Sequence, residues 1–129
     1  MAKRPPSILL IEPDRLLARG YVEALVQAGY DPQWSNDAQT AILAADKKTP
    51  KLVIVELQLA GHSGVEFLYE FRSYPEWQKV PVLVLSGVPR EESGMPGELD
   101  LAGFLYKPQI SLRKLVTTVG RILEPAHAR

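Results

Sequence analysis

Four short apolar runs recur along the chain and alternate with segments of a different hydrophobic period. The runs span residues 8–11, 52–55, 82–85 and 104–106, and they are rich in Ile, Leu and Val. They lack polar alternation, as strands buried on both faces do. The intervening segments carry apolar residues at spacings of three and four, which is typical of amphipathic helices. This alternation predicts an α/β fold, a parallel sheet with helices on both faces.

The predicted helices begin at capping residues and end near Gly or Pro. Asp14 is the expected N-cap of the first helix and Gly29 its end, Ser35 or Asn36 is expected to cap the second, and Ser111 the last. The apolar residues expected to face the core are Leu17, Tyr21, Leu25, Ala28, Ala38, Ile42, Ala45, Val65, Leu68, Phe71, Leu112, Leu115, Val119 and Ile122. Residues 30–34 predict a weak strand that Pro32 confines to a sheet edge.

Residues 88–97 do not fit a helix. This segment holds two prolines and two glycines, which cost about 3 and 1 kcal/mol each inside a helix relative to Ala. We expect a loop here, followed by at most one helical turn near residues 98–102. Such a loop is either a remodelled binding surface or a variable connection.

Composition narrows the possible partners. The 129 residues fit one domain, expected over residues 8–123, with 1–7 as a short disordered lead and 124–129 as a tail. Fifteen basic and fifteen acidic side chains cancel, so we expect no direct binding to nucleic acid. No apolar stretch approaches the roughly 20 residues that span a bilayer, and we expect no membrane contact. The absence of cysteine excludes disulfides and thiol catalysis and fits a cytoplasmic location.

The residues that directly follow the apolar runs include charged and hydroxyl side chains. They are Glu12 and Pro13, Glu56, Ser86 and Gly87, and Lys107 and Pro108. In this order and spacing the chain resembles the receiver domain of bacterial two-component response regulators, over nearly its whole length. Gly61, Gly64 and the Val80-Pro81 pair support the resemblance. It implies a doubly wound, flavodoxin-like sheet of five parallel strands in the order 2-1-3-4-5.

The resemblance also implies roles for individual residues. Glu56 occupies the position of the phosphate-accepting aspartate. Glu12 and Pro13 occupy the two positions where the family has an acidic pair that binds the metal ion. Ser86, Gly87 and Lys107 match the positions that sense the phosphoryl group, and Phe104 matches the aromatic residue that rotates on activation. The peptide bond before Pro108 is expected to be cis, as in the family.

Two of these positions depart from the family pattern. Pro13 has no side-chain oxygen, whereas Mg2+ needs several converging oxygens. Glu56 is longer than aspartate by a methylene, about 1.5 Å, while catalytic groups are held to about 0.5 Å. We therefore expect no catalytic residue, no cofactor and no bound metal, with Glu12 and Glu56 as ligands if any metal binds. Glu56 either bonds Ser86 and Lys107 as a partial mimic of activation, or forms an inert ion pair with Lys107.

The favoured function is a phosphorylation-independent signalling module that is not an enzyme. We expect it to bind a protein partner or a second copy through residues 88–97, the fifth strand and the last helix. Exposed members are expected among Tyr106, Arg113, Lys114 and Arg121.

Two other functions are alternatives to this one. A phosphorylated response regulator with an atypical site and a small-ligand-binding α/β domain are the alternatives, although no Gly-rich phosphate loop follows Ile11. His62 and Ser63 lie near Glu56 in sequence, but neighbours on one turn project apart and do not make a hydrolytic triad. His127 offers no metal-binding spacing with His62.

Overall fold

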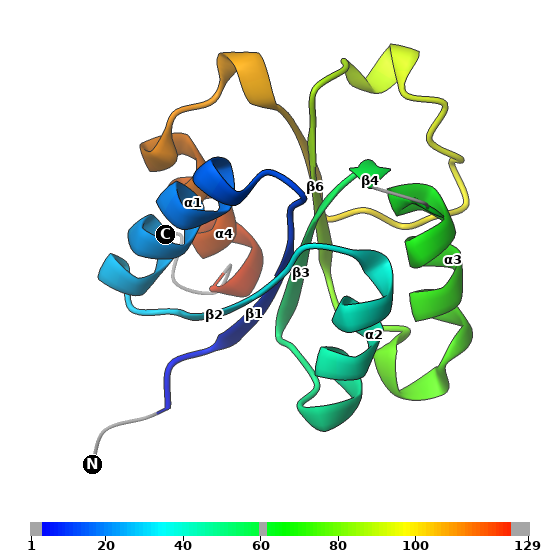
Figure 1. Cartoon of the computed structure of the whole chain (residues 1–129), viewed down its shortest axis with the longest axis horizontal. Helices are drawn as coiled ribbons and strands as arrows, with labels where there is room; N and C mark the ends of the chain where they lie inside the picture. The colour runs from blue at the N-terminus through cyan, green and yellow to red at the C-terminus, as the bar shows by residue number, and fades with distance from the viewer. Residues whose placement is uncertain (1–3, 60–61, 125–129) are drawn as a thin grey trace.

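The central sheet is built from the apolar runs of the sequence. The structure is a computed structural model and describes residues 4–59 and 62–124. Its five parallel strands are β1 (Ser7–Ile11), β2 (Asp31–Ser35), β3 (Leu52–Glu56), β6 (Val82–Ser86) and β7 (Gly103–Tyr106). They lie in the order β2-β1-β3-β6-β7, which confirms the predicted topology and the edge position of β2 (Figure 1). Because β1 begins at Ser7, the last residue of the predicted lead belongs to the sheet.

Helices cover both faces of this sheet. The helices α1 (Arg15–Gln27) and α4 (Leu112–Leu123) lie on one face, and α2 (Ala38–Lys47) and α3 (Gly64–Ser73) lie on the other (Figure 1). The remaining elements are a hairpin of β4 (Gln58–Leu59) and β5 (His62–Ser63) and the 3-10 turns η1 (Pro75–Trp77), η2 (Arg90–Glu92) and η3 (Lys107–Gln109). Among the described residues, none of the helices has the length and apolar character needed to cross a bilayer.

The core is divided by the sheet into two apolar layers. Along β1, Leu9 and Ile11 pack in the layer under α2 and α3, whereas Ile8 and Leu10 pack in the layer under α1 and α4. This alternation is the ordinary consequence of strand geometry. Because β1, β3 and β6 are buried on both faces, their sequences are almost continuously apolar, as the pattern predicted.

The caps confirm two predictions and correct one. Asp14 accepts a hydrogen bond from the N–H of Leu17 at 3.0 Å, and Ser111 caps α4. Asp37, rather than Ser35 or Asn36, caps α2, because its carboxylate accepts the N–H of Thr40 at 2.8 Å. Ser35 cannot serve, since it is still part of β2.

The structure also corrects the prediction of which residues of α1 and α4 face the core. Leu17 and Leu112 are 41% and 47% exposed, and Ala28 is exposed as well. The stripe of α1 instead runs through Ala18, Tyr21 and Leu25, which repeats at three and four residues and leaves Leu17 one position off the buried face. Leu112 lies in the first turn of α4, outside the stripe that Leu115 and Val119 form.

Residues 88–97 lie in a loop, as predicted, but the helical turn expected at residues 98–102 is misplaced and the loop continues to residue 102. The turn is η2 at 90–92, after Pro89 with φ −63°, and residues 98–102 are not helical. The loop runs past α3 (Figure 1) and is anchored to it. In the loop, Asp100 accepts a hydrogen bond from Arg72 of α3, Glu98 accepts one from Tyr69 of α3, and Leu99 is buried. Arg72 also donates to the carbonyl oxygens of Trp77, Gln78 and Val80, which precede β6.

Candidate functional site

The residues that the sequence singled out meet at the carboxyl end of the sheet, the upper edge in Figure 1. Glu12 follows β1, Glu56 ends β3, Ser86 ends β6 and Lys107 follows β7. Parallel strands bring their carboxyl ends to one edge, so residues nearly 100 positions apart become neighbours. Glu12, Glu56 and Ser86 are 1%, 5% and 0% exposed.

The Lys107 ammonium bridges the two carboxylates. Its Nζ lies 2.6 Å from Glu12 Oε1 and 2.5 Å from Glu56 Oε1, and the Lys107 side chain is only 14% exposed. Burial lowers the pKa of Lys107, but hydrogen bonds and charges from Glu12 and Glu56 outweigh burial and raise this pKa above its ordinary value. The ion pair with Glu56 was predicted, whereas the pair with Glu12 was not.

The second oxygen of each carboxylate binds the backbone two residues further on. Glu12 Oε2 accepts the N–H of Asp14 at 2.9 Å, and Glu56 Oε2 accepts the N–H of Gln58 at 3.2 Å. In each carboxylate, therefore, one oxygen accepts a hydrogen bond from a backbone N–H and the other contacts the ammonium of Lys107. With all three groups ionised, two negative charges and one positive charge are held in a buried site.

Ser86 does not bond Glu56, so the first of the two alternatives for Glu56, the partial mimic of activation, lacks one of its two bonds. The Ser86 hydroxyl oxygen accepts the N–H of Val88 at 3.0 Å, a local bond of the kind that serine favours at strand ends. Its position at the site is as expected, but its partner is the backbone. Since Glu56 turns to Gln58 and Lys107, it bonds only one of the two groups that would sense a phosphoryl group.

The other sequence-selected residues surround this cluster. Pro13 and Gly87 are exposed at the ends of β1 and β6. Phe104 is half-buried on β7, with the guanidinium carbon of Arg90 5.9 Å from its ring centroid. The loop residue Arg90 thereby contacts the aromatic position that the resemblance implies for switching, within reach of a cation–π interaction.

The predicted cis bond before Pro108 is wrong, because the described residues contain no cis peptide bond. Lys107 and Pro108 begin the turn η3, where the fixed φ of proline suits the first positions of a helical turn with a trans bond. Ser63 caps α3 and exchanges hydrogen bonds with Glu66, so its hydroxyl serves the helix. Residues 60–61 of the predicted turn and His127 lie outside the described residues.

Two residues near the site were missed by sequence reasoning. The indole N–H of Trp34 on β2 donates to the carbonyl oxygen of Glu12 at 2.8 Å. Burial raises the pKa of Tyr21 on α1, where Lys107 lowers it and Glu12 raises it, which places the phenol in the field of the cluster. The helical period marked Tyr21 only as a core residue, and no local signal in the sequence connects Trp34 with Glu12.

Within residues 4–59 and 62–124, no three His, Cys, Asp or Glu side chains are grouped so that they could hold a metal ion. Glu12 and Glu56 come together as the sequence suggested, but Lys107 lies between them.

Comparisons with known proteins agree with this fold. The chain is 32% identical over 104 residues to the KDP operon transcriptional regulatory protein KdpE of Escherichia coli, covering 79% of this chain and 44% of that protein. It is 35% identical over 79 residues to the transcriptional regulatory protein QseB of Haemophilus influenzae, covering 61% of this chain and 35% of that protein. The chain thus spans less than half the length of these two curated relatives.

A solved structure and a family profile cover more of the chain. The structure of a chemotaxis response regulator of Vibrio cholerae superposes with a TM-score of 0.85 at 22% identity, covering 92% of this chain and 99% of that one. The profile described as the response regulator receiver domain matches residues 8–120. Members of this family act with partner proteins in two-component systems. The chain therefore belongs to the response regulator receiver domain family.

Proposed function

We propose that this receiver domain signals without being phosphorylated and acts through protein contacts rather than catalysis. The observation that carries the proposal is the bridge from Lys107 to both Glu12 and Glu56. A buried ammonium already supplies the positive charge between the two carboxylates. The site then has a fixed state that needs neither metal ion nor phosphate.

The donor set does not fit the magnesium ion that phosphoryl transfer in the family requires. Magnesium takes about six oxygens in an octahedron, with carboxylates among them. Both oxygens of Glu12 and both of Glu56 have contacts with Lys107 or backbone N–H groups. Pro13 adds no oxygen. A metal ion would have to displace the ammonium and would still lack a ligand.

Glu56 is also poorly placed as a nucleophile. Attack on phosphorus needs a carboxylate oxygen that is free and in line with the leaving group. Glu56 is 5% exposed, and its two oxygens are held by Lys107 and by the N–H of Gln58. These contacts favour the fixed ion pair over the phosphate-accepting role.

The proposal predicts no phosphorylation by a small phosphodonor. Incubation with acetyl phosphate and Mg2+, followed by intact-mass measurement, is expected to leave the mass unchanged. Glu56→Asp alone is expected to stay unmodified, because the metal site is still incomplete. Adding Pro13→Asp is expected to restore measurable Mg2+ binding, and calorimetry would follow it.

Two outcomes would contradict this account. One is a gain of one phosphoryl group in the wild-type protein that Glu56→Gln abolishes, which would favour a phosphorylated regulator with an atypical site. The other is equal phosphorylation of Glu56→Asp with and without Pro13→Asp, because Pro13 would then be irrelevant to the site.

The contact surface that we propose is formed by residues 88–97, β7 and α4. Arg113, Lys114 and Arg121 are exposed and Tyr106 is half-buried. A groove of about 700 Å³ lies between β7 and the start of α4 and is lined by Tyr106, Ile110 and Lys114, among others. Aromatic and cationic side chains around an apolar floor are the usual anchors of protein interfaces.

Substitutions on this surface are expected to remove partner binding or self-association. Tyr106→Ala and Arg113→Glu should each weaken it by about 2 kcal/mol or more if they lie at the centre of the interface. Pull-down and analytical ultracentrifugation would measure the loss, after circular dichroism confirms that each variant folds. Arg19→Glu, on exposed α1, is the control. Loss of binding in the control alone would place the interface on α1 rather than on β7 and α4.

A further inference from the structure

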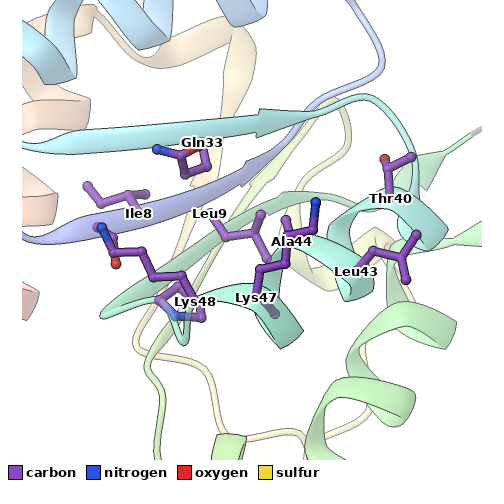
Figure 2. Close-up of a pocket in the computed structure, with 11 residues that line it drawn as sticks. Ile8, Leu9, Gln33, Thr40, Leu43, Ala44, Lys47 and Lys48 are labelled. Atoms are coloured by element: carbon purple, nitrogen blue, oxygen red, sulfur yellow. The ribbon is translucent and has the colours of Figure 1, made fainter.

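A second site lies away from the carboxylate cluster, in a groove between α2 and β2. The groove has a volume of about 470 Å³, which is in the range of small-molecule sites. Figure 2 shows Gln33 of β2 and Ala44 of α2 on opposite sides of the groove, with Leu9 of β1 between them. Ser7, the first residue of β1, also lines it, so the groove reaches the end of β1 opposite to Glu12.

The groove exists because α2 presents small side chains to the sheet. The buried residues of α2 are Ala38, Ala41 and Ala45, and alanine fills little of the space between a helix and a sheet. On β2, the residue that faces α2 is Gln33, which is exposed. Leu43 stands at the edge of the groove with 58% of its surface exposed. The floor and one wall are therefore apolar and open.

Polar groups at one end of the groove have hydrogen-bonding capacity to spare. Ser7 is 6% exposed, and strand alternation with Leu9 turns its side chain towards α2. Ser7 lines the groove, and its hydroxyl is not a buried, unsatisfied group. A serine hydroxyl both donates and accepts hydrogen bonds, so Ser7 can bond the polar group of a molecule at this end of the groove.

Two lysines give this end a positive charge. Lys47 and Lys48 both line the groove. Lys48 Nζ lies 3.4 Å from Asp31 Oδ2, with side chains 54% and 37% exposed. Such exposed pairs are weak and exchange readily, so Lys48 is available to another carboxylate. The two lysines carry two positive charges against the single negative charge of Asp31, so this end of the groove has a net charge of +1.

We propose that the groove binds a small amphipathic carboxylate. Its apolar body packs over Leu9, Leu43 and Ala44. Its carboxylate pairs with Lys47 and Lys48 and accepts the hydrogen bond of the Ser7 hydroxyl. This site is independent of the Lys107 cluster and of phosphorylation.

Octanoate is the probe, titrated into the 15N-labelled full chain, with the uncharged octanol and the shorter butyrate as comparisons. Saturable amide shifts are expected at residues 7–9, 33 and 43–48, with octanoate the tightest ligand. Lys48→Met should weaken octanoate about three- to fivefold, the effect of one exposed ion pair, and leave octanol unchanged. Ser7→Ala should weaken octanoate as well.

Ala44→Leu fills the groove and should abolish the saturable shifts. Ala24→Leu is the matched control, because Ala24 is a half-buried helical alanine that lines a different groove, between α1 and α4. The dispersion of the amide spectrum reports whether each variant folds. If Ala44→Leu does not fold, Lys48→Met still tests the proposal. The proposal is overturned if octanoate gives no saturable shifts, if the shifts cluster around Gly20 and Leu112, or if neither Ala44→Leu nor Lys48→Met changes them.

Discussion

Lys107→Met is expected to destabilise the domain by about 3–5 kcal/mol, the usual cost of removing one partner from a buried ion pair. The substitution leaves Glu12 and Glu56 as two buried carboxylates whose Oε1 atoms have lost their cation. Like charges held close together in a site of low polarity repel. Urea unfolding followed by circular dichroism would measure the loss.

The controls separate the charge from the side chain. Lys79→Met changes an exposed lysine and is expected to stay within about 0.5 kcal/mol of wild type. Adding Glu12→Gln and Glu56→Gln to Lys107→Met should recover much of the loss, because the uncompensated charges are gone. A Lys107→Met variant as stable as Lys79→Met would show that the three groups are screened by water and do not form a fixed site.

The same ion pairs should appear in the pH dependence of stability. Because the pKa of Lys107 is raised in the folded state, its contribution is complete below the unfolded pKa of about 10.4. It is then lost as the pH rises through the higher folded pKa. The difference in unfolding free energy between wild type and Lys107→Met should therefore be constant from pH 7 to 9 and shrink above that range.

Sequence reasoning located the site but not all of its bonds. The order of parallel strands places the residues after Ile11, Val55, Leu85 and Tyr106 at one edge, and this topology follows from hydrophobic pattern and resemblance alone. The bridge to Glu12 depends on how far the Lys107 side chain reaches across the end of β6, which no spacing encodes. The backbone bond of the Ser86 hydroxyl, by contrast, is of the kind that serine favours at strand ends.

The fold, like the site, was predicted only in part. Strands buried on both faces were evident because their sequences are almost uniformly apolar. Asp37 was missed as a cap because three consecutive polar residues, Ser35, Asn36 and Asp37, all qualify, and only the backbone decides which one precedes the first turn. The loop at 88–102 was recognised from its Pro and Gly content, but its attachment through Arg72 is a tertiary contact between distant segments.

Gly64→Ala is expected to cost about 1–3 kcal/mol, the usual penalty for forcing an extra methyl into a packed site. A Cβ at Gly64 would lie 2.5 Å from the carbonyl oxygen of Glu56 and 2.7 Å from the Cα of Leu57. Both neighbours are backbone, so no side chain can move aside. Since the N–H of Gly64 also donates to the carbonyl oxygen of Leu57 at 2.7 Å, the methyl group would push the start of α3 away from the end of β3.

Gly87→Ala is the matched control, because a Cβ at Gly87 meets nothing within 4 Å, and it should change stability by no more than about 0.5 kcal/mol. Gly87 follows Ser86 of the site and Gly64 follows Ser63, the cap of α3, and sequence alone gave no reason to rank the two glycines. Thermal and urea unfolding would measure the two costs. Amide shifts at Glu56 and Gln58 in Gly64→Ala would report the displacement of the strand end that presents the Glu56 carboxylate to Lys107. Equal stability of the two variants, with Glu56 unshifted, would mean that α3 and β3 separate without cost and that the Glu56 position does not depend on this close approach.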